Sequence, residues 1–209
     1  MEVIFGTTSD RKKNDLQNII NQLGLELQVL SMDDIGWNRG DIIEDGSTIE
    51  ENSLIKAKAI HSFCKDNNID MPIITDDAGL FVESLDNKPG VFTSRYGDDE
   101  LALNPQLPEY QCVLKLLREL KDIKNRDAVY RCCVTIMLPD GSSYQKFGES
   151  NGTIAENIIG DLTKPFFYSV FILQGTKVTF NRLKDEELNN TYRYRALKES
   201  LHLLVMKWL

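Results

Sequence analysis

The stretch Met71-Pro72-Ile73-Ile74-Thr75-Asp76-Asp77-Ala78-Gly79 joins an apolar run to a pair of adjacent acids. Residues 71–75 are rich in isoleucine and bounded by polar turns, which predicts a buried strand. We expect this strand to end at Asp76 and Asp77. Carboxylates at the exit of a buried strand are well placed for a functional site, although Asp-Asp before glycine is also a common turn composition. Both interpretations of the acidic pair stay open at this point.

Strands and helices alternate on the N-terminal side of this stretch. The predicted elements are a strand at 3–5, a loop at 6–10, a helix with apolar residues at 16, 19, 20 and 23, a strand at 25–30 and an exposed loop at 31–46. A second helix should run from Thr48 to about Lys65. Its start has the form of a capping box, Thr48-Ile49-Glu50-Glu51, with Ser47 as the alternative cap.

On the C-terminal side of this stretch, strands predominate in the middle. The predicted elements are a helix at 108–121, a surface loop at 121–127, a strand at 128–138, a turn at 139–141, its hairpin partner at 143–148 and a last helix at about 185–208. The pattern predicts a mixed α/β fold with an elongated central sheet and flanking helices. We expect residues 1–209 to form a single domain.

Composition narrows the possible functions. A net charge of −8 opposes a broad surface for nucleic acid or anionic lipid, because a phosphate backbone needs a basic face. No apolar run is long enough to span a membrane and the N-terminus lacks a signal-peptide pattern, which predicts a cytoplasmic protein. The four cysteines form no CxxC pair, which argues against structural zinc. Cys132 and Cys133 are expected to be reduced packing residues on opposite faces of one strand.

Carboxylates are the leading candidates for chemistry, since two histidines and no GxSxG or Cys-His arrangement leave little for acyl transfer. Asp76 and Asp77 follow the buried strand, and Glu51 lies on the preceding helix. These three acids could hold a hard cation. Mg²⁺ prefers one or two carboxylates together with water and phosphate oxygens, so the cluster predicts a magnesium ion that arrives with a nucleotide.

Cations lie where a triphosphate would need them. Lys12 is near the start of the first helix, whose N-terminus after Gly6-Thr7-Thr8 offers amide donors to an anion. Lys56 stands four residues after Asn52 on one helix face. Arg193 suits bidentate phosphate binding. Each of these side chains taken alone is also compatible with an ordinary solvated surface residue.

Together these motifs resemble the inosine triphosphate pyrophosphatase family along most of the chain. Residues 6–12 look like its N-terminal phosphate loop, with Ser9 in place of the usual asparagine. Residues 48–57 are similar to its helix containing Glu-Asn and a later Lys-Ala. Residues 75–80 and 89–96 are similar to its Asp-Asp-Ser-Gly-Leu and Pro-Gly-Val-Tyr-Ser-Ala-Arg-Tyr motifs, in the same order and at a fitting separation.

The resemblance implies a fold, a reaction and a set of site residues. The fold would be an elongated α/β architecture with two lobes enclosing a cleft, usually as a homodimer. The reaction would be Mg²⁺-dependent hydrolysis of ITP, dITP or XTP to monophosphate and pyrophosphate, by a metal-bound water that Asp77 activates. Asp77 and Lys56 would be catalytic, with Glu51, Asp76 and Asp77 on the metal. The implied substrate-binding residues are Thr7, Ser9, Lys12, Asn52, Phe166, Tyr168, Ser169 and Arg193.

Departures from the family pattern lie where the base would be recognised. The family's Gly-Phe-Gly-Tyr-Asp-Pro corresponds here to Pro165-Phe166-Phe167-Tyr168-Ser169-Val170, so Ser169 replaces an aspartate. A lysine followed by Ser-His-Arg corresponds to Glu187 and then Thr191-Tyr192-Arg193. A site built on polar contacts to a base loses selectivity without them, although a nucleotide pocket with a stacking Phe166 or Phe167 remains compatible with this segment.

Three alternatives therefore stay open. The chain could bind a nucleotide without turnover, or it could be a pyrophosphatase with a changed base preference, for a modified pyrimidine or another purine. Paired carboxylates also serve glycoside hydrolysis, but the flanking lysines are not what a sugar site needs.

Overall fold

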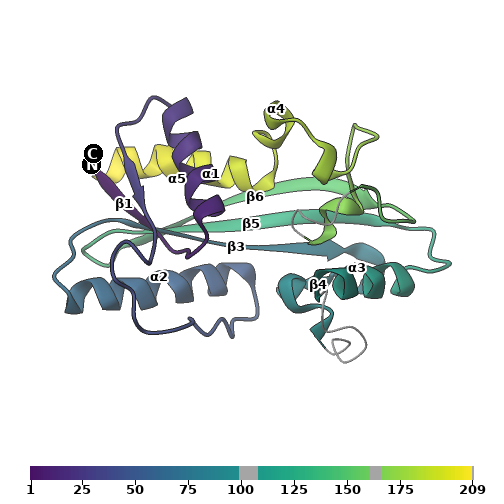
Figure 1. The fold of residues 1–209 in the computed structure, drawn as a ribbon, viewed down its shortest axis with the longest axis horizontal. Helices are drawn as coiled ribbons and strands as arrows, with labels where there is room; N and C mark the ends of the chain where they lie inside the picture. The colour runs from purple at the N-terminus through teal and green to yellow at the C-terminus, as the bar shows by residue number, and fades with distance from the viewer. Residues whose placement is uncertain (99–107, 161–165, 209) are drawn as a thin grey trace. The chain divides into compact units, whose positions relative to one another are not determined.

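A mixed seven-stranded sheet is the frame of the computed structural model, which describes residues 1–98, 108–160 and 166–208 (Figure 1). The strands are β1 (Glu2–Phe5), β2 (Gln28–Leu30), β3 (Ile73–Val82), β4 (Lys88–Gly90), β5 (Asp127–Met137), β6 (Ser143–Ile154) and β7 (Phe171–Leu173). Their order is β2-β1-β3-β5-β6-β7, with β4 paired to β3. Strand β1 runs parallel to β2 and β3, whereas β4 and β7 are antiparallel to their neighbours.

Helices flank this sheet. They are α1 (Asp10–Gln22), α2 (Ile49–Asp66), α3 (Pro108–Glu119), α4 (Asp185–Leu188) and α5 (Tyr192–Trp208), and the short 3-10 helices are η1 (Glu83–Leu85), η2 (Thr93–Arg95), η4 (Phe166–Ser169) and η5 (Phe180–Arg182). The predicted α/β class with a mixed sheet and flanking helices is confirmed. In the described residues, no helix combines the length and apolar character needed to cross a membrane.

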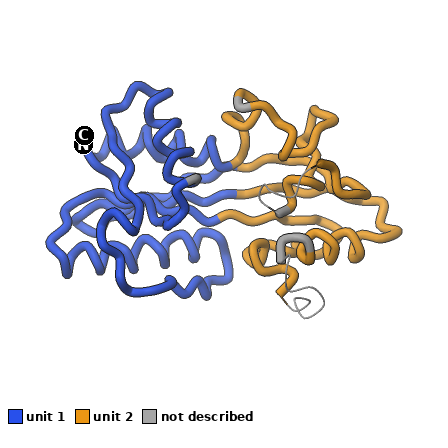
Figure 2. Tube along the Cα trace, in the orientation of Figure 1, with its two compact units in different colours: residues 1–77, 132–148, 193–209 blue, residues 78–131, 149–192 orange. Residues whose placement is uncertain are grey.

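The chain divides into two compact units (Figure 2). Unit 1 contains residues 1–77, 132–148 and 193–209, and unit 2 contains residues 78–131 and 149–192. Strands β3, β5 and β6 contribute residues to both units. The single domain expected over residues 1–209 stays a prediction.

Unit 1 has helices on both faces of its strands, with α2 on one side and α1 and α5 on the other (Figure 1). Helix α2 begins as predicted, because the Thr48 hydroxyl accepts the Glu51 N–H at 3.1 Å. Its buried face presents Ala57, Ile60 and Phe63 to the core at helical spacing. These side chains pack with Ile4 and Ile73 of the sheet, so burial holds α2 against β1 and β3.

Several predicted elements were wrong in their bounds. Strand β3 does not end at Thr75 but continues to Val82, so Asp76 and Asp77 lie inside the strand. Leu80 and Val82 are fully buried and pair with β4, and this tertiary pairing outweighs the poor strand propensity of aspartate. The last predicted helix is two helices, α4 and α5, and the hairpin partner β6 is longer than expected. The four cysteines are buried thiols, as expected for packing residues.

Candidate active site

A tight loop connects β1 to α1 at the predicted phosphate-binding segment. A Cβ at Gly6 would lie 2.7 Å from the Thr75 methyl carbon and 2.8 Å from Ile60 Cδ1, so a larger residue would require these buried side chains to move. The Thr7 hydroxyl accepts the Ser9 N–H at 3.1 Å. The Ser9 hydroxyl in turn caps α1 by accepting the Lys12 N–H. Loop and cap together fix the first turn of α1, from which Lys12 projects.

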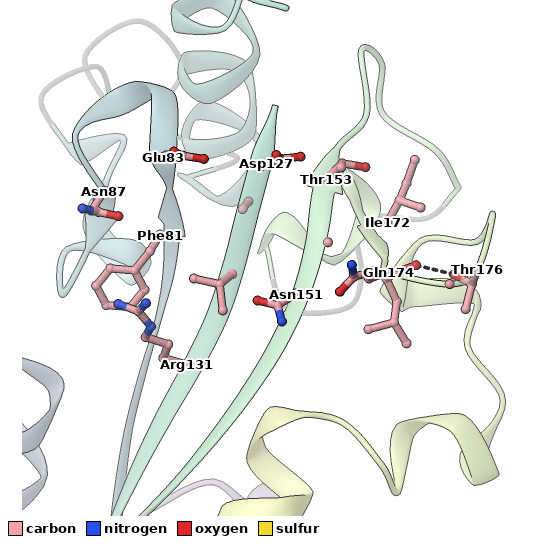
Figure 3. A pocket seen from close by; sticks show the side chains of 15 residues that line it. Phe81, Glu83, Asn87, Asp127, Arg131, Asn151, Thr153, Ile172, Gln174 and Thr176 are labelled. Atoms are coloured by element: carbon pink, nitrogen blue, oxygen red, sulfur yellow. Dashed lines mark hydrogen bonds between the residues drawn. The ribbon is translucent and has the colours of Figure 1, made fainter. Parts of the chain in front are cut away.

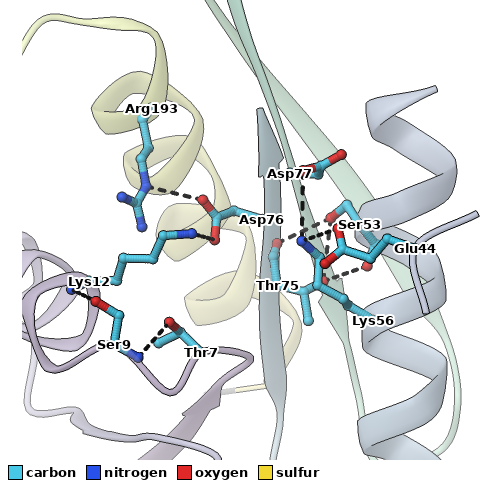
Figure 4. A network of polar contacts seen from close by, with 10 residues as sticks. All are labelled: Thr7, Ser9, Lys12, Glu44, Ser53, Lys56, Thr75, Asp76, Asp77 and Arg193. Carbon is cyan, nitrogen blue, oxygen red and sulfur yellow. Dashed lines mark hydrogen bonds and ion pairs between the residues drawn. The ribbon is translucent and has the colours of Figure 1, made fainter. Parts of the chain in front are cut away.

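Asp76 is the centre of the first of two charged clusters (Figure 4). Its Oδ1 lies 3.7 Å from Lys12 Nζ and its Oδ2 lies 3.1 Å from Arg193 Nε. The Asp76 side chain is only 4% exposed. Burial alone would raise the pKa of Asp76, but the charges of Arg193, Lys12 and Lys56 outweigh burial and hold this pKa well below its ordinary value. Asp76 is therefore ionised at neutral pH and balances two cations.

Lys56 is the centre of the second charged cluster. Its Nζ lies 2.9 Å from Glu44 Oε2 and 3.8 Å from Asp77 Oδ1. Burial opposes the charged form of Lys56, but nearby carboxylates outweigh it and raise the pKa of the ammonium. The pKa of Asp77 is also raised, chiefly by burial, despite the opposing charge of Lys56. Asp77 Oδ2 is buried without a hydrogen-bond partner among the described residues.

The two clusters lie on opposite faces of one strand. Consecutive residues of a β-strand point to opposite sides, so Asp76 faces α1 and α5 whereas Asp77 faces α2 (Figure 4). The acidic pair thus serves neither a turn nor a strand exit. Each carboxylate meets its own cation, and the alternation of β3 explains why two adjacent acids have oppositely shifted pKa values.

Glu51 and Asn52 are placed at the entry of α2. The Glu51 carboxylate accepts the Ser47 N–H at 2.6 Å and the Ser47 hydroxyl at 2.7 Å, and these bonds lower the pKa of Glu51. Asn52 is 2% exposed, and its Oδ1 accepts the Gly46 N–H at 2.8 Å. Across residues 1–98, 108–160 and 166–208, no three His, Cys, Asp or Glu side chains gather as a metal site. The metal set of Glu51, Asp76 and Asp77 stays a prediction.

Glu44 is the site residue that sequence reasoning missed. It lies in the loop before α2, where neither hydrophobic periodicity nor a cap singled it out. Only the folded structure places it, through the ion pair of its Oε2 with Lys56 Nζ at 2.9 Å.

The predicted base-recognition residues belong to unit 2. The Tyr168 and Tyr192 hydroxyls are hydrogen-bonded at 2.8 Å, and the Tyr192 ring stacks on Tyr130 at 4.8 Å between centroids. Ser169 is 1% exposed. The side chain of Phe166 and residue Pro165 lie outside the described part of the chain. Base contacts by this segment therefore stay predictions.

Unit 2 also contains a groove of about 630 Å³ on its sheet (Figure 3). Polar and aromatic side chains line it, among them Phe81, Asn87, Arg131, Asn151, Gln174 and Thr176. Arg131 lies over the Phe81 ring, 4.9 Å from its centroid, and pairs with Glu149 at 2.9 Å. None of the predicted site residues lines this groove. The clustered cations around Asp76 and Asp77 are a better match to an anionic substrate.

Comparisons of the sequence agree with the motif resemblance. A model of the Ham1 family matches residues 3–202. The dITP/XTP pyrophosphatase of Leptospira interrogans is 31% identical over 209 residues, which cover 99% of this chain and 98% of that protein. The dITP/XTP pyrophosphatase of Bacillus subtilis is 30% identical over 207 residues, or 97% of this chain and 96% of that protein.

Solved structures share the fold. The Staphylococcus aureus Ham1 protein superposes with a TM-score of 0.79 at 23% identity, covering 99% of this chain and 98% of its own. A HAM1 protein from Coxiella burnetii gives a TM-score of 0.80 at 24% identity, covering 99% of both chains. The arrangement of sheet and helices is therefore one already seen in solved proteins.

Proposed function

The chain belongs to the Ham1 family, and from this premise we propose that it hydrolyses ITP, dITP and XTP to monophosphate and pyrophosphate. The observation that carries the proposal is the pair of charged clusters around Asp76 and Asp77, which are neighbours on β3. Lys12, Arg193 and Lys56 are three cations around two adjacent carboxylates. This arrangement suits a substrate with several negative charges and a water that must lose a proton.

The two faces of β3 have separate roles in this proposal. Lys12 and Arg193 bind phosphate oxygens, helped by the capped N-terminus of α1 beyond Thr7 and Ser9. Asp77 accepts the proton of the water that attacks the α-phosphorus; in the metal-free chain burial raises its pKa, which favours a proton acceptor at this position. Lys56 keeps Asp77 in place and offsets the charge that develops on the phosphate.

A magnesium ion fits the Asp77 side of the strand. Among the residues that the structure describes, Asp77 Oδ2 has no hydrogen-bond partner, and Glu44 brings a second carboxylate to the same Lys56 ammonium. Mg²⁺ takes one or two carboxylates and completes its shell with water and phosphate. When bound there, the ion supplies charge neutralisation and lowers the pKa of water. Glu51 is hydrogen-bonded to Ser47, and Asp76 lies on the opposite face of β3 (Figure 4). We therefore assign Asp77 and Glu44, the two carboxylates beside Lys56, as the ligands.

Some residues assigned to the nucleotide base differ from the family pattern. Phe166, Tyr168 and Ser169 are assigned to the base from the motif match, with Ser169 and Tyr192 where the family pattern has charged or imidazole partners. This substitution supports a second candidate, a pyrophosphatase whose base preference differs from ITP and XTP. We further propose a cytoplasmic homodimer, on the family resemblance; a single-chain mass near 23.9 kDa in solution would argue against the dimer.

Pyrophosphate release across a panel of nucleotides tests the proposal. ITP, dITP, XTP, GTP, ATP and modified pyrimidine triphosphates are assayed with Mg²⁺, and again after its removal with a chelator. We expect release to be fastest with ITP, dITP or XTP and to stop without the metal. Another preferred base would establish the second candidate. Binding without release from any nucleotide would sink both enzymatic candidates and leave a nucleotide-binding protein.

A further inference from the structure

Three hydroxyl groups meet in the interior of unit 1. Ser53 of α2, Thr75 of β3 and Thr135 of β5 are each 0% exposed. The Ser53 hydroxyl donates to Thr135 Oγ1 at 2.8 Å, and the Thr75 hydroxyl donates to the Ser53 carbonyl at 2.7 Å. We call these three residues the hydroxyl cluster. Figure 4 shows Ser53 and Thr75 beside the Lys56 side chain.

A fourth element joins the hydroxyl cluster through Thr135. Gln145 of β6 donates from Nε2 to Thr135 Oγ1 at 3.1 Å and to the Glu50 carbonyl of α2 at 2.9 Å. Thr135 Oγ1 therefore accepts from two side chains at once. Through this oxygen, α2 is connected to β5. Gln145 also connects α2 directly to β6, and Thr75 connects α2 to β3.

Stability alone does not account for these groups. The surrounding layer of α2 and β3 is apolar, with Ile60 and Ile73 fully buried. Replacing both members of a buried polar pair by apolar groups of similar shape is often neutral or stabilising. What a satisfied buried network adds is a unique arrangement of the elements that carry it, because each hydrogen bond holds only over a narrow range of distance and angle.

The hydroxyl cluster is next to the chemistry in sequence and in space. Lys56 follows Ser53 by three residues, so both lie on one face of α2. Asp77 follows Thr75 by two residues, so both face α2 from β3. The same short segments thus carry the hydroxyl cluster and the pair of Lys56 Nζ and Asp77 Oδ1, whose separation is 3.8 Å.

We propose that the hydroxyl cluster sets α2 against β3 so that Lys56 meets Asp77, which makes Thr135 a positioning residue for hydrolysis. Thr135 acts in this role through its hydrogen bonds with Ser53 and Gln145. The inference rests on the proposed function for its catalytic consequence. A misplacement of about 1 Å at a reacting group can cost on the order of 100-fold in rate.

Two variants of Thr135 separate positioning from packing. Thr135→Val keeps the shape and removes the acceptor of two hydrogen bonds, whereas Thr135→Ser keeps the oxygen and removes a buried methyl. Steady-state pyrophosphate release is measured well below the melting temperature of each variant. We expect kcat of Thr135→Val to fall at least about 10-fold with KM nearly unchanged, because Lys12 and Arg193 lie on the opposite face of β3. Thr135→Ser should keep most of the wild-type kcat.

A purely structural role predicts that the activity of each variant follows its melting temperature, whichever atom is removed, so that two variants of equal stability have equal kcat. Hydrogen exchange of the α2 amides around Ser53 to Lys56 gives a readout that needs no turnover, and it should quicken in Thr135→Val but not in Thr135→Ser. Wild-type kcat and wild-type exchange in Thr135→Val would overturn the inference. If the wild-type chain releases no pyrophosphate, the proposed function fails, and the exchange data alone decide whether the hydroxyl cluster positions α2.

Discussion

Asp77→Asn should lower kcat for pyrophosphate release at least about 100-fold, because a positioned general base contributes roughly 10²- to 10⁴-fold. Asparagine has the same shape but cannot take a proton at neutral pH. The loss should appear in kcat more than in KM, since the cations assigned to phosphate binding pair with Asp76 on the other face of β3. Steady-state kinetics on ITP with Mg²⁺ measure it.

The stability of Asp77→Asn should not fall with its activity. Burial raises the pKa of Asp77, so the charged carboxylate opposes folding above that pKa. A neutral amide removes this cost, and we expect Asp77→Asn to melt at the wild-type temperature or above. Glu44 still pairs with Lys56 at 2.9 Å in the variant. A variant that is both inactive and clearly less stable would mean that Asp77 holds the fold, and wild-type turnover would remove it from the mechanism.

Asp76→Asn should instead destabilise the chain by about 2 kcal/mol, because removing one partner leaves buried charges without compensation. Lys12 remains 36% exposed, which limits the loss, whereas the Arg193 side chain is only 12% exposed. Urea unfolding at pH 7 measures the difference. Asp66→Asn is the matched control, since its ion pair with Arg39 is exposed and is expected to contribute less than about 1 kcal/mol.

Two further measurements identify the cause of that destabilisation. The pKa of Asp76 is lowered in the fold, so its stabilising effect is present above the ordinary aspartate pKa of about 4 and is lost as the pH falls below it. The difference in the free energy of unfolding between wild type and Asp76→Asn should therefore become smaller in acid.

Pyrophosphate should raise the melting temperature of the variant more than that of the wild type, because it supplies the missing negative charge. Equal shifts would contradict phosphate binding at Lys12.

Local patterns were enough to predict much of this site. The loop before α1, the cap at Thr48 and the placement of Lys56 on α2 follow from spacing within single elements, and the structure has them where they were expected. That the loop binds phosphate stays a prediction. The family resemblance rested on the same short motifs. What spacing could not supply was the length of β3, since its continuation past Asp77 depends on pairing with β4, which begins only at Lys88.

Contacts between distant segments account for the other differences. Glu44 reaches Lys56 from a loop without periodicity, so no local signal marked it. The hydrogen bond from Ser53 to Thr135 joins residues 82 positions apart, and Gln145 reaches the Glu50 carbonyl across 95. Each of these residues is unremarkable within its own element. Their relation exists only once the sheet has assembled.

Because successive side chains of β3 point to opposite faces, the active site depends on whether the strand changes length by an odd or an even number of residues. Because Asp76 and Asp77 face opposite sides, deleting one residue from β3 ahead of them would exchange their surroundings, and the proposed base would meet Lys12 and Arg193. Deleting two residues would keep each carboxylate on its own side and only shift it along the strand. Length variation in this strand is therefore expected to be tolerated, if at all, in even steps.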